Sequence, residues 1–252
     1  MAEDKKFDFP TDEVELPSGG KIYGKDSPLY DGKIELKYMT AREEDILTSQ
    51  NLIKKGLVIQ KLLDSLIVTE GISSNDLIIG DKNAVMVAAR ILAYGPEYKV
   101  QVTNPNTDNE FEYTFDLTEC DFKNISDDVD SNEFNIELPF SKVKVTFKLL
   151  TGYDEVNIDK ELAGYKKVGS EFNPELTTRL KHTITSVNGD NSKATISTFV
   201  DNMLSRDSLY LRSEITKIAP DINLEQEIEV EGETVKVAIP MAVNFFWPDT
   251  ES

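Results

Sequence analysis

The sequence predicts an α+β fold, because helical and strand-like stretches follow one another in blocks along the chain. Apolar residues recur every three to four positions at 40–95 and at 173–220, which is the spacing of amphipathic helices. Between these regions, at 98–149, apolar and polar residues alternate as they do in half-buried strands, and the alternation returns at 228–239. This order of helices, strands, helices and strands argues against a doubly wound α/β fold.

The composition is that of a folded, strongly acidic protein. Among 252 residues, 27 Lys and Arg stand against 46 Asp and Glu, which gives a formal net charge of −19. Since 39% of the residues are hydrophobic, the chain can still bury a core. The charge repels phosphate backbones and no basic cluster is visible, so we expect no nucleic-acid partner. No apolar run approaches the roughly 18–20 residues of a membrane span, and residues 1–6 are too polar for a signal peptide.

Residues 1–38 are predicted to form an extended N-terminal arm with a hairpin. Short alternating runs lie on both sides of the turn sequence Ser18-Gly19-Gly20. Residues 34–38 alternate again and are a further pairing candidate for the arm.

A first helical half is expected at 39–96. Thr40 and Glu43 have the spacing of a capping box, in which each residue serves the backbone of the other. The last helix of this half is expected to begin at Asp81 as its N-cap. It should end at Gly95-Pro96, a pair that stops helices.

Three segments complete the prediction: a β-rich insert at 97–150, a second helical half at 151–220, and a C-terminal hairpin with an aromatic tail at 221–252. In the second half, one helical face is predicted over 176–187. We expect the two helical halves to form one body, because each apolar stripe is too small to be stable alone. The strands of the insert should lie beside the hairpin at 226–240.

No residue pattern indicates a catalytic, cofactor or metal site. His182 lies on a predicted helix, and Cys120 lies between acidic neighbours, which raise a thiol pKa. The turn at 18–21 lacks the first glycine and the hydroxyl residue of a phosphate loop. Residues 128–133 match only the first side-chain ligands of a calcium loop and lack its glycine. With 46 carboxylates in the chain, a suitable acid/base pair would carry no information.

Two blocks of the sequence resemble the baseplate hub protein family of T-even-type contractile-tailed phages. The first is KYMTAREEDIL at 37–47 with its continuation to Gly56, and the second runs from Pro220 through Pro240 to the FFWP sequence at 245–248. The resemblance covers the chain from about residue 12. Many members of that family carry Cys-x-x-Cys knuckles, whereas the matching positions here hold no cysteine. Because zinc needs about four thiolate or imidazole ligands, we expect no zinc.

The resemblance implies a non-enzymatic structural or assembly protein of the baseplate hub. Its partners would be other hub and tail proteins, without a cofactor or a membrane span. It would act in the host cytoplasm during assembly and would be a candidate for the virion tail baseplate. Two alternatives stay open. One is a tail-associated cell-wall hydrolase, which needs an acid/base pair in a cleft, and the other is an assembly chaperone that is absent from the mature particle.

Seven residues from the two blocks are the candidate partner-binding residues. They are Arg42, Glu43, Glu44, Phe245, Phe246, Trp247 and Pro248. The three charged residues equally fit a helix start with local ion pairs. The aromatic residues are either interface anchors or core residues that seal the last hairpin, since three adjacent side chains cannot all face one side of a strand.

Overall fold

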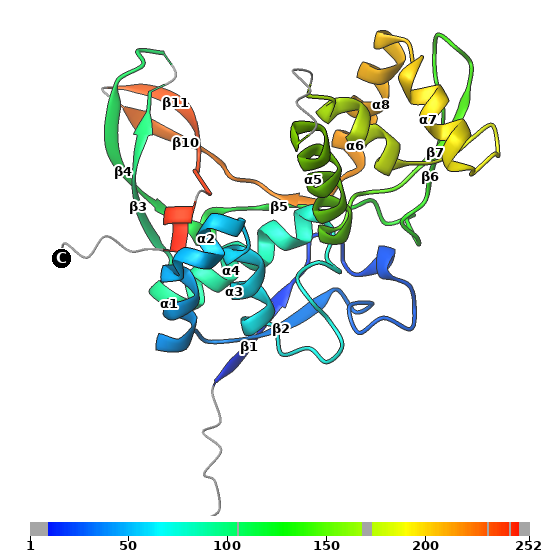
Figure 1. Cartoon of the computed structure of the whole chain (residues 1–252). Coiled ribbons are helices and arrows are strands. Elements are labelled where there is room, and N and C mark those ends of the chain that lie inside the picture. The colour runs from blue at the N-terminus through cyan, green and yellow to red at the C-terminus, as the bar shows by residue number, and fades with distance from the viewer. Residues whose placement is uncertain (1–9, 105, 168–172, 231, 242, 247–252) are drawn as a thin grey trace, which may run out of the picture.

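The α+β class is confirmed by the computed structural model, in which the chain forms two lobes (Figure 1). The structure describes residues 10–104, 106–167, 173–230, 232–241 and 243–246. The first lobe comprises residues 10–120 and 222–246, whose buried apolar side chains share one core. The second lobe comprises residues 134–218 and has a core of its own. The second lobe is therefore inserted into the sequence of the first.

The first lobe combines four helices with three antiparallel strand pairs, β1–β2, β3–β4 and β10–β11. The helices are α1 (Ala41–Thr48), α2 (Gln50–Lys55), α3 (Val58–Leu66) and α4 (Ile79–Tyr94). The strands are β1 (Thr11–Glu15), β2 (Lys33–Lys37), β3 (Glu97–Thr103), β4 (Glu110–Asp116), β10 (Glu225–Val230) and β11 (Glu233–Ala238). Short 3-10 helices occupy Lys21–Tyr23, Leu117–Glu119 and Val243–Phe246.

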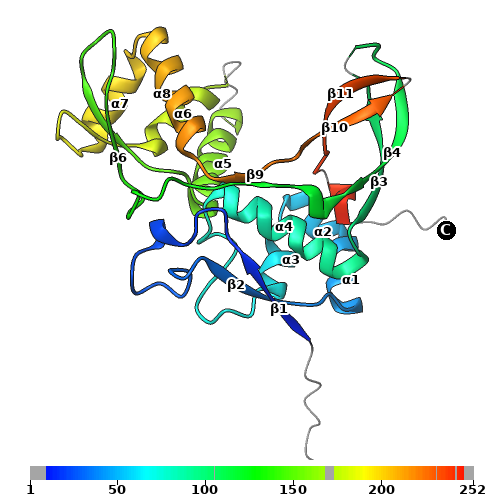
Figure 2. The same ribbon diagram turned by 180° about the vertical axis from the view of Figure 1, so that it is seen from behind.

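The second lobe packs helices against an antiparallel sheet with the order β6–β7–β8. Its strands are β6 (Phe134–Glu137), β7 (Lys144–Phe147) and β8 (Ile184–Val187). Its helices are α5 (Gly152–Lys167), α6 (Glu175–Thr183), α7 (Lys193–Asp201) and α8 (Ser205–Ile218). Where the chain crosses between the lobes, β5 (Phe122–Lys123) pairs with β9 (Asp221–Ile222) (Figure 2).

In the N-terminal arm, β1 pairs with the later of the two alternating runs that follow it, at residues 33–37. β1 runs antiparallel to β2, with Val14 opposite Ile34. The prediction of a hairpin closed directly by the Ser-Gly-Gly turn is wrong, because Lys21–Tyr23 forms a 3-10 helix and not a strand. Gly20 has a positive φ of 76°, and a Cβ at this position would lie 2.2 Å from the Leu29 carbonyl oxygen. The turn therefore folds back on residues 29–32 and lengthens the connection between the strands.

Helix α4 begins before its predicted N-cap. Ile79 is its first residue, and Asp81 is buried in the first turn. The Asp81 carboxylate accepts hydrogen bonds from the Ser18 backbone nitrogen at 2.9 Å, the Ser18 hydroxyl at 2.6 Å and the Tyr23 hydroxyl at 2.5 Å. Burial raises the pKa of Asp81 even though these bonds oppose the shift. Asp81 thus attaches the N-terminal arm to α4 instead of capping its own helix.

The helical face predicted over 176–187 is wrong in its second half. Helix α6 ends at Thr183, and the next four residues form strand β8, which pairs with β7. Ile184 and Val187 are β-branched, so they suit a strand, and both are buried in the core of the second lobe. Pairing with β7 therefore overrides the helical spacing.

The two helical halves touch in a small cluster that includes Ile78 beside α4 and Ile215 of α8, but each has a main core of its own. Helices α1 to α4 pack against β3, β4, β10 and β11, whereas α6 to α8 pack against β6 to β8. The β-rich insert at 97–150 is divided between the lobes for the same reason. Only its first hairpin, β3–β4, lies beside β10–β11 as expected (Figures 1 and 2). Each helical half buries its apolar stripe on its own strands.

Candidate functional site

The predicted site residue Glu43 belongs to the interior of the first lobe. Its side chain is 0% exposed and accepts hydrogen bonds from Lys37 Nζ at 2.8 Å and Ser65 Oγ at 2.7 Å. The Thr40 backbone nitrogen and hydroxyl also donate to it, at 2.9 Å and 2.6 Å, which confirms the capping box. Arg42 and Glu44 are exposed. Glu43 therefore fits the alternative of a helix start with local ion pairs and is not available to a partner.

The Glu43 cluster predicts an acid-dependent loss of stability. Burial alone would raise the pKa of Glu43, but the hydrogen bonds from Lys37, Thr40 and Ser65 outweigh it and lower the pKa from 4.5 to about 2. A pKa lowered in the folded state stabilises the fold above about pH 4.5, and this contribution is lost as the pH falls toward 2.

Glu43→Gln should therefore cost about 3 kcal/mol of unfolding free energy at pH 7. Between pH 4.5 and pH 2, its stability should depend less on pH than that of the wild type. Urea unfolding at pH 7 and pH 3 measures both effects. The control is the exposed neighbour Glu44→Gln, with an expected change within about 0.5 kcal/mol. Equal losses for the two variants would contradict the assignment.

The two described aromatic residues of the C-terminal block are core residues. Phe245 and Phe246 are fully buried, and their rings meet edge to face at 5.3 Å. The Phe245 ring also lies 5.0 Å from that of Tyr98 in β3. The structure thus places these two residues as the seal of the last hairpin, not as exposed anchors. Trp247 and Pro248 lie outside the described residues.

Arg90 of α4 holds the C-terminal segment in place, a role that the sequence did not reveal. Its guanidinium group is buried and donates to three carbonyl oxygens: Phe245 at 3.0 Å, Gly95 at 3.2 Å and Glu97 at 3.3 Å. It also lies 5.7 Å from the centre of the Tyr98 ring. The sequence did contain one indication of this role, since Arg90 stands in an otherwise apolar part of the helix.

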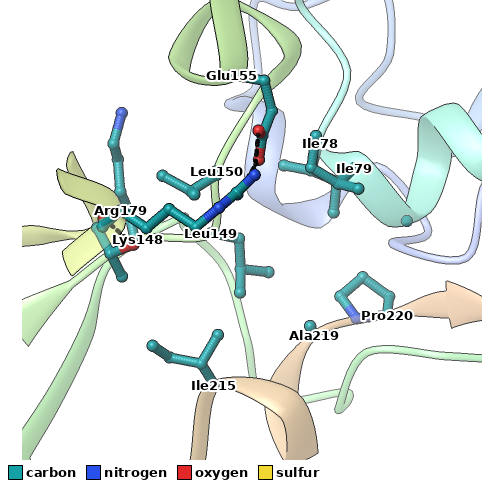
Figure 3. A pocket seen from close by; sticks show the side chains of 12 residues that line it. Ile78, Ile79, Lys148, Leu149, Leu150, Glu155, Arg179, Ile215, Ala219 and Pro220 are labelled. Carbon is teal, nitrogen blue, oxygen red and sulfur yellow. Dashed lines mark hydrogen bonds and ion pairs between the residues drawn. The ribbon is translucent and has the colours of Figure 1, made fainter. Parts of the chain in front are cut away.

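A pocket of about 260 Å³ opens where the two lobes meet (Figure 3). The start of α4, the segment between β7 and α5, and the end of α8 with the residues that follow it supply its apolar walls. These apolar lining residues are Ile78, Ile79, Leu149, Leu150, Ile215, Ala219 and Pro220. We call this feature the junction pocket.

The charged groups at the junction pocket are engaged with one another. Arg179 binds Glu155 through two hydrogen bonds, of 2.7 Å and 2.9 Å, drawn as dashed lines in Figure 3. Donation of these hydrogen bonds to the Glu155 carboxylate raises the pKa of Arg179. Lys148 donates to both oxygens of Asp154, at 2.7 Å and 2.8 Å. An apolar pocket with paired charges at its side is suited to receive an apolar side chain.

Glycine residues allow the two lobes to approach at this pocket. A Cβ on Gly80 would lie 1.9 Å from the Pro220 carbonyl oxygen, and one on Gly152 would lie 2.6 Å from Asn75 Cα. Gly80 is the second residue of α4 and Gly152 is the first residue of α5, and both helices begin at the junction between the lobes (Figures 1 and 2). Backbone therefore packs directly on backbone here, which only glycine permits.

A second candidate is an exposed apolar surface on the second lobe, formed by α8 and the β6–β7 turn. The fractional exposures are 52% for Phe140, 54% for Leu204, 62% for Leu209 and 37% for Tyr210. The Arg206 guanidinium carbon lies 5.1 Å from the centre of the Phe140 ring. Leu209 and Tyr210 are neighbours of Arg206 on α8, three and four residues on. We call these five residues the Phe140 surface.

Asp207 holds the Phe140 surface in one conformation. Its carboxylate is buried and accepts hydrogen bonds from the backbone nitrogens of Phe140 at 3.0 Å and Ser141 at 2.9 Å. Burial alone would raise the pKa of Asp207, but these bonds outweigh it and lower the pKa. The turn that presents Phe140 is therefore anchored to the first turn of α8. No residue pattern in the sequence indicated that Phe140 and Asp207 lie together at a surface.

His182 and Cys120 each contact a neighbouring side chain. His182 Nε2 lies 3.2 Å from Glu161. Cys120 is buried, and burial, followed by nearby carboxylates, raises its pKa. Within the described part of the chain, no group of three His, Cys, Asp or Glu side chains is arranged to hold a metal ion. No helix in the same residues has the length and apolar character needed to cross a membrane.

Comparison with known proteins identifies the family. Residues 9–247 match the family model described as T4 bacteriophage base plate protein. No curated protein and no solved structure matches the chain. Such a protein is associated with the phage tail and with other tail proteins, in agreement with the resemblance noted in the sequence. Because the match covers nearly the whole chain, the chain belongs to the T4 bacteriophage base plate protein family.

Proposed function

We propose that this baseplate protein is a non-enzymatic structural or assembly protein of the baseplate hub and acts through protein–protein contacts. The observation that carries the proposal is the Phe140 surface. It combines exposed leucine, arginine and tyrosine side chains at α8 with Phe140, which lies on a turn whose backbone is held by Asp207. Aromatic residues and arginine dominate binding energy at protein interfaces, and a preorganised surface loses little conformational entropy on binding.

The buried carboxylates support a structural role. Glu43 attaches α1 to β2 and α3, Asp81 attaches the N-terminal arm to α4, and Asp207 attaches the β6–β7 turn to α8. Each accepts at least two hydrogen bonds from groups that belong to another element. Buried carboxylates that are held by hydrogen bonds in this way stabilise the fold and are not exposed to a substrate as a general base would have to be.

The hub assignment can be tested in a phage that encodes this chain. Inactivation of its gene should stop baseplate formation at the hub, and complementation with the wild-type gene should restore it. Mass spectrometry of purified particles then separates a resident subunit from an assembly chaperone. Complementation with Phe140→Ser, combined with Leu209→Ser, should fail, whereas Tyr30→Ser, an exposed aromatic residue of the arm, should succeed.

Two results would contradict this function. Normal baseplates without the protein would remove the hub role. Release of soluble fragments from cell-wall preparations by the purified protein would instead favour the tail-associated hydrolase.

A further inference from the structure

We propose that the outer edge of strand β1 binds an extended, basic segment of another tail protein, which adds a strand to the sheet of the N-terminal arm. This inference goes beyond the proposed hub function, because it assigns a second surface and the chemistry of the segment that this surface receives. Only the identity of the partner as a tail protein rests on that function. The edge is tested on the purified chain and the hub role in the phage, so the two can fail separately.

The sheet of the arm has one open edge. Strand β2 is paired on both sides, since β1 lies on one side and the Val68 backbone nitrogen donates to the Glu35 carbonyl oxygen at 3.0 Å on the other. Among the described residues, none pairs with the outer side of β1 at residues 11–15. The strand lies at the surface of the first lobe, and only Val14 is partly covered (Figures 1 and 2). An unpaired strand edge of this kind is a template for a further strand.

The register of β1 on β2 determines which backbone groups this edge offers. Just beyond β1, the Leu16 backbone nitrogen donates to the Gly32 carbonyl oxygen at 2.8 Å. In an antiparallel ladder, every second residue forms hydrogen bonds with the neighbouring strand, so the even-numbered residues of β1 are bonded to β2. The N–H and C=O groups of Thr11, Glu13 and Glu15 therefore point away from β2.

The same edge already receives a hydrogen bond at one end. Pro17 continues the odd-numbered series, and its carbonyl oxygen accepts from the Ile125 backbone nitrogen at 3.2 Å. Ile125 belongs to the chain that crosses between the lobes. A turn follows, in which the Val129 backbone nitrogen donates to the Ser126 carbonyl oxygen at 3.2 Å. The crossing chain thus pairs with the edge only beyond β1 and leaves the outward groups at 11–15 available.

The charge of the edge favours a basic partner segment. Strand β1 contains Asp12, Glu13 and Glu15 but no lysine or arginine. The hydrogen bond to Glu13 raises the pKa of Lys33, and the charges of Glu15 and Asp31 add to this shift, as expected in a negative local potential. An added strand with lysine or arginine at alternate positions would place these side chains beside Glu13 and Glu15.

Two features argue against a second copy of this chain as the partner. Pairing of two β1 edges would set three carboxylates against the same three carboxylates, and like charges on facing strands are destabilising. The chain does contain one basic alternating run, KVKVTFK at 142–148. Its central part is strand β7, which is already paired on both sides, by β6 and β8. The complementary strand therefore has to come from a different protein.

Fluorescence anisotropy with the labelled peptide TKVKVRT tests binding to the full chain. The wild type should bind this peptide and should not bind its acidic counterpart TEVEVET. Glu13→Pro should weaken binding by about tenfold, because proline removes the central outward N–H. The bonds of the even-numbered residues to β2 should remain, since proline is tolerated at such edge positions. Glu13→Thr is the matched control, which loses the same charge but keeps the N–H, and should weaken binding by only about threefold.

Hydrogen exchange measured by NMR locates the peptide on β1. In the free protein, the amides of Thr11, Glu13 and Glu15 should exchange faster than those of Asp12 and Val14. Addition of TKVKVRT should slow exchange at the three odd-numbered residues.

Two further peptides separate strand pairing from attraction by charge alone. Each is TKVKVRT with methyl groups on the backbone nitrogens of alternate residues, in one register or the other, so both keep the full charge. Only the peptide whose remaining N–H groups face β1 should bind. These peptides also decide the question if Glu13→Pro is poorly folded. Any one of three results overturns the proposal: no binding of TKVKVRT, equal binding of the two methylated peptides, or unchanged exchange at the odd-numbered residues.

Discussion

Phe245→Ala is expected to reduce the unfolding free energy of the chain by about 3–5 kcal/mol. The Phe245 ring is fully buried between Tyr98 and Phe246, with edge-to-face contacts to both. Removal of the ring loses its apolar burial and leaves a cavity under the last hairpin. The Arg90 hydrogen bond to the Phe245 carbonyl also depends on the position of this segment.

Denaturant unfolding of the purified variant measures this loss. The matched control is Phe140→Ala, which removes an exposed phenylalanine and should change stability by less than about 0.5 kcal/mol. In a complementation assay of baseplate assembly, Phe140→Ala should cause the larger loss of the two variants. A stable Phe245→Ala variant that fails in assembly would restore the view that this residue is an interface anchor.

Gly80→Ala should destabilise the protein by about 2–3 kcal/mol, although alanine is the better helix former. Its Cβ would meet the Pro220 carbonyl oxygen at 1.9 Å, and a backbone atom cannot move aside as a flexible side chain can. The start of α4 would have to separate from the chain that leads into β9. Thermal and urea unfolding should both detect the loss.

Gly164→Ala provides a control with the opposite sign. Gly164 lies inside α5, and nothing lies within 4 Å of a Cβ at this position. Without a steric cost, the substitution should stabilise the protein by roughly 0.5–1 kcal/mol, because alanine restricts the unfolded backbone. Stabilisation by both substitutions would show that α4 does not need its close approach to Pro220.

Local features of the sequence were sufficient where the interaction itself is local. Thr40 and Glu43 are three residues apart, so their capping box is visible in the sequence, and Gly95 ends α4 as predicted. The predictions failed where a distant segment takes over. Asp81 was expected to cap α4 but binds Ser18 and Tyr23, more than 50 residues away. No short-range pattern encodes such a choice.

The candidate site was less predictable than the fold. The sequence favoured the C-terminal aromatic residues, of which Phe245 and Phe246 are buried. Phe140 lies in a turn, outside any periodic run, so no pattern in the sequence indicated it. A different feature indicated this surface: Leu209 and Tyr210 are large side chains on the solvent-facing side of α8. Only the structure shows that the β6–β7 turn brings Phe140 to Arg206 and Asp207 of α8.

The insertion of one lobe into the other determines the order in which the chain can fold during its synthesis. Residues 134–218 are continuous, so the core of the second lobe can close soon after residue 218 leaves the ribosome. The first lobe has to wait for its last strands, since Arg90 and Phe245 are 155 residues apart. Contacts over such separations form slowly. A nascent chain should therefore carry a finished second lobe while the apolar face of α4 remains open, and arrival of β10, β11 and Phe246 closes it.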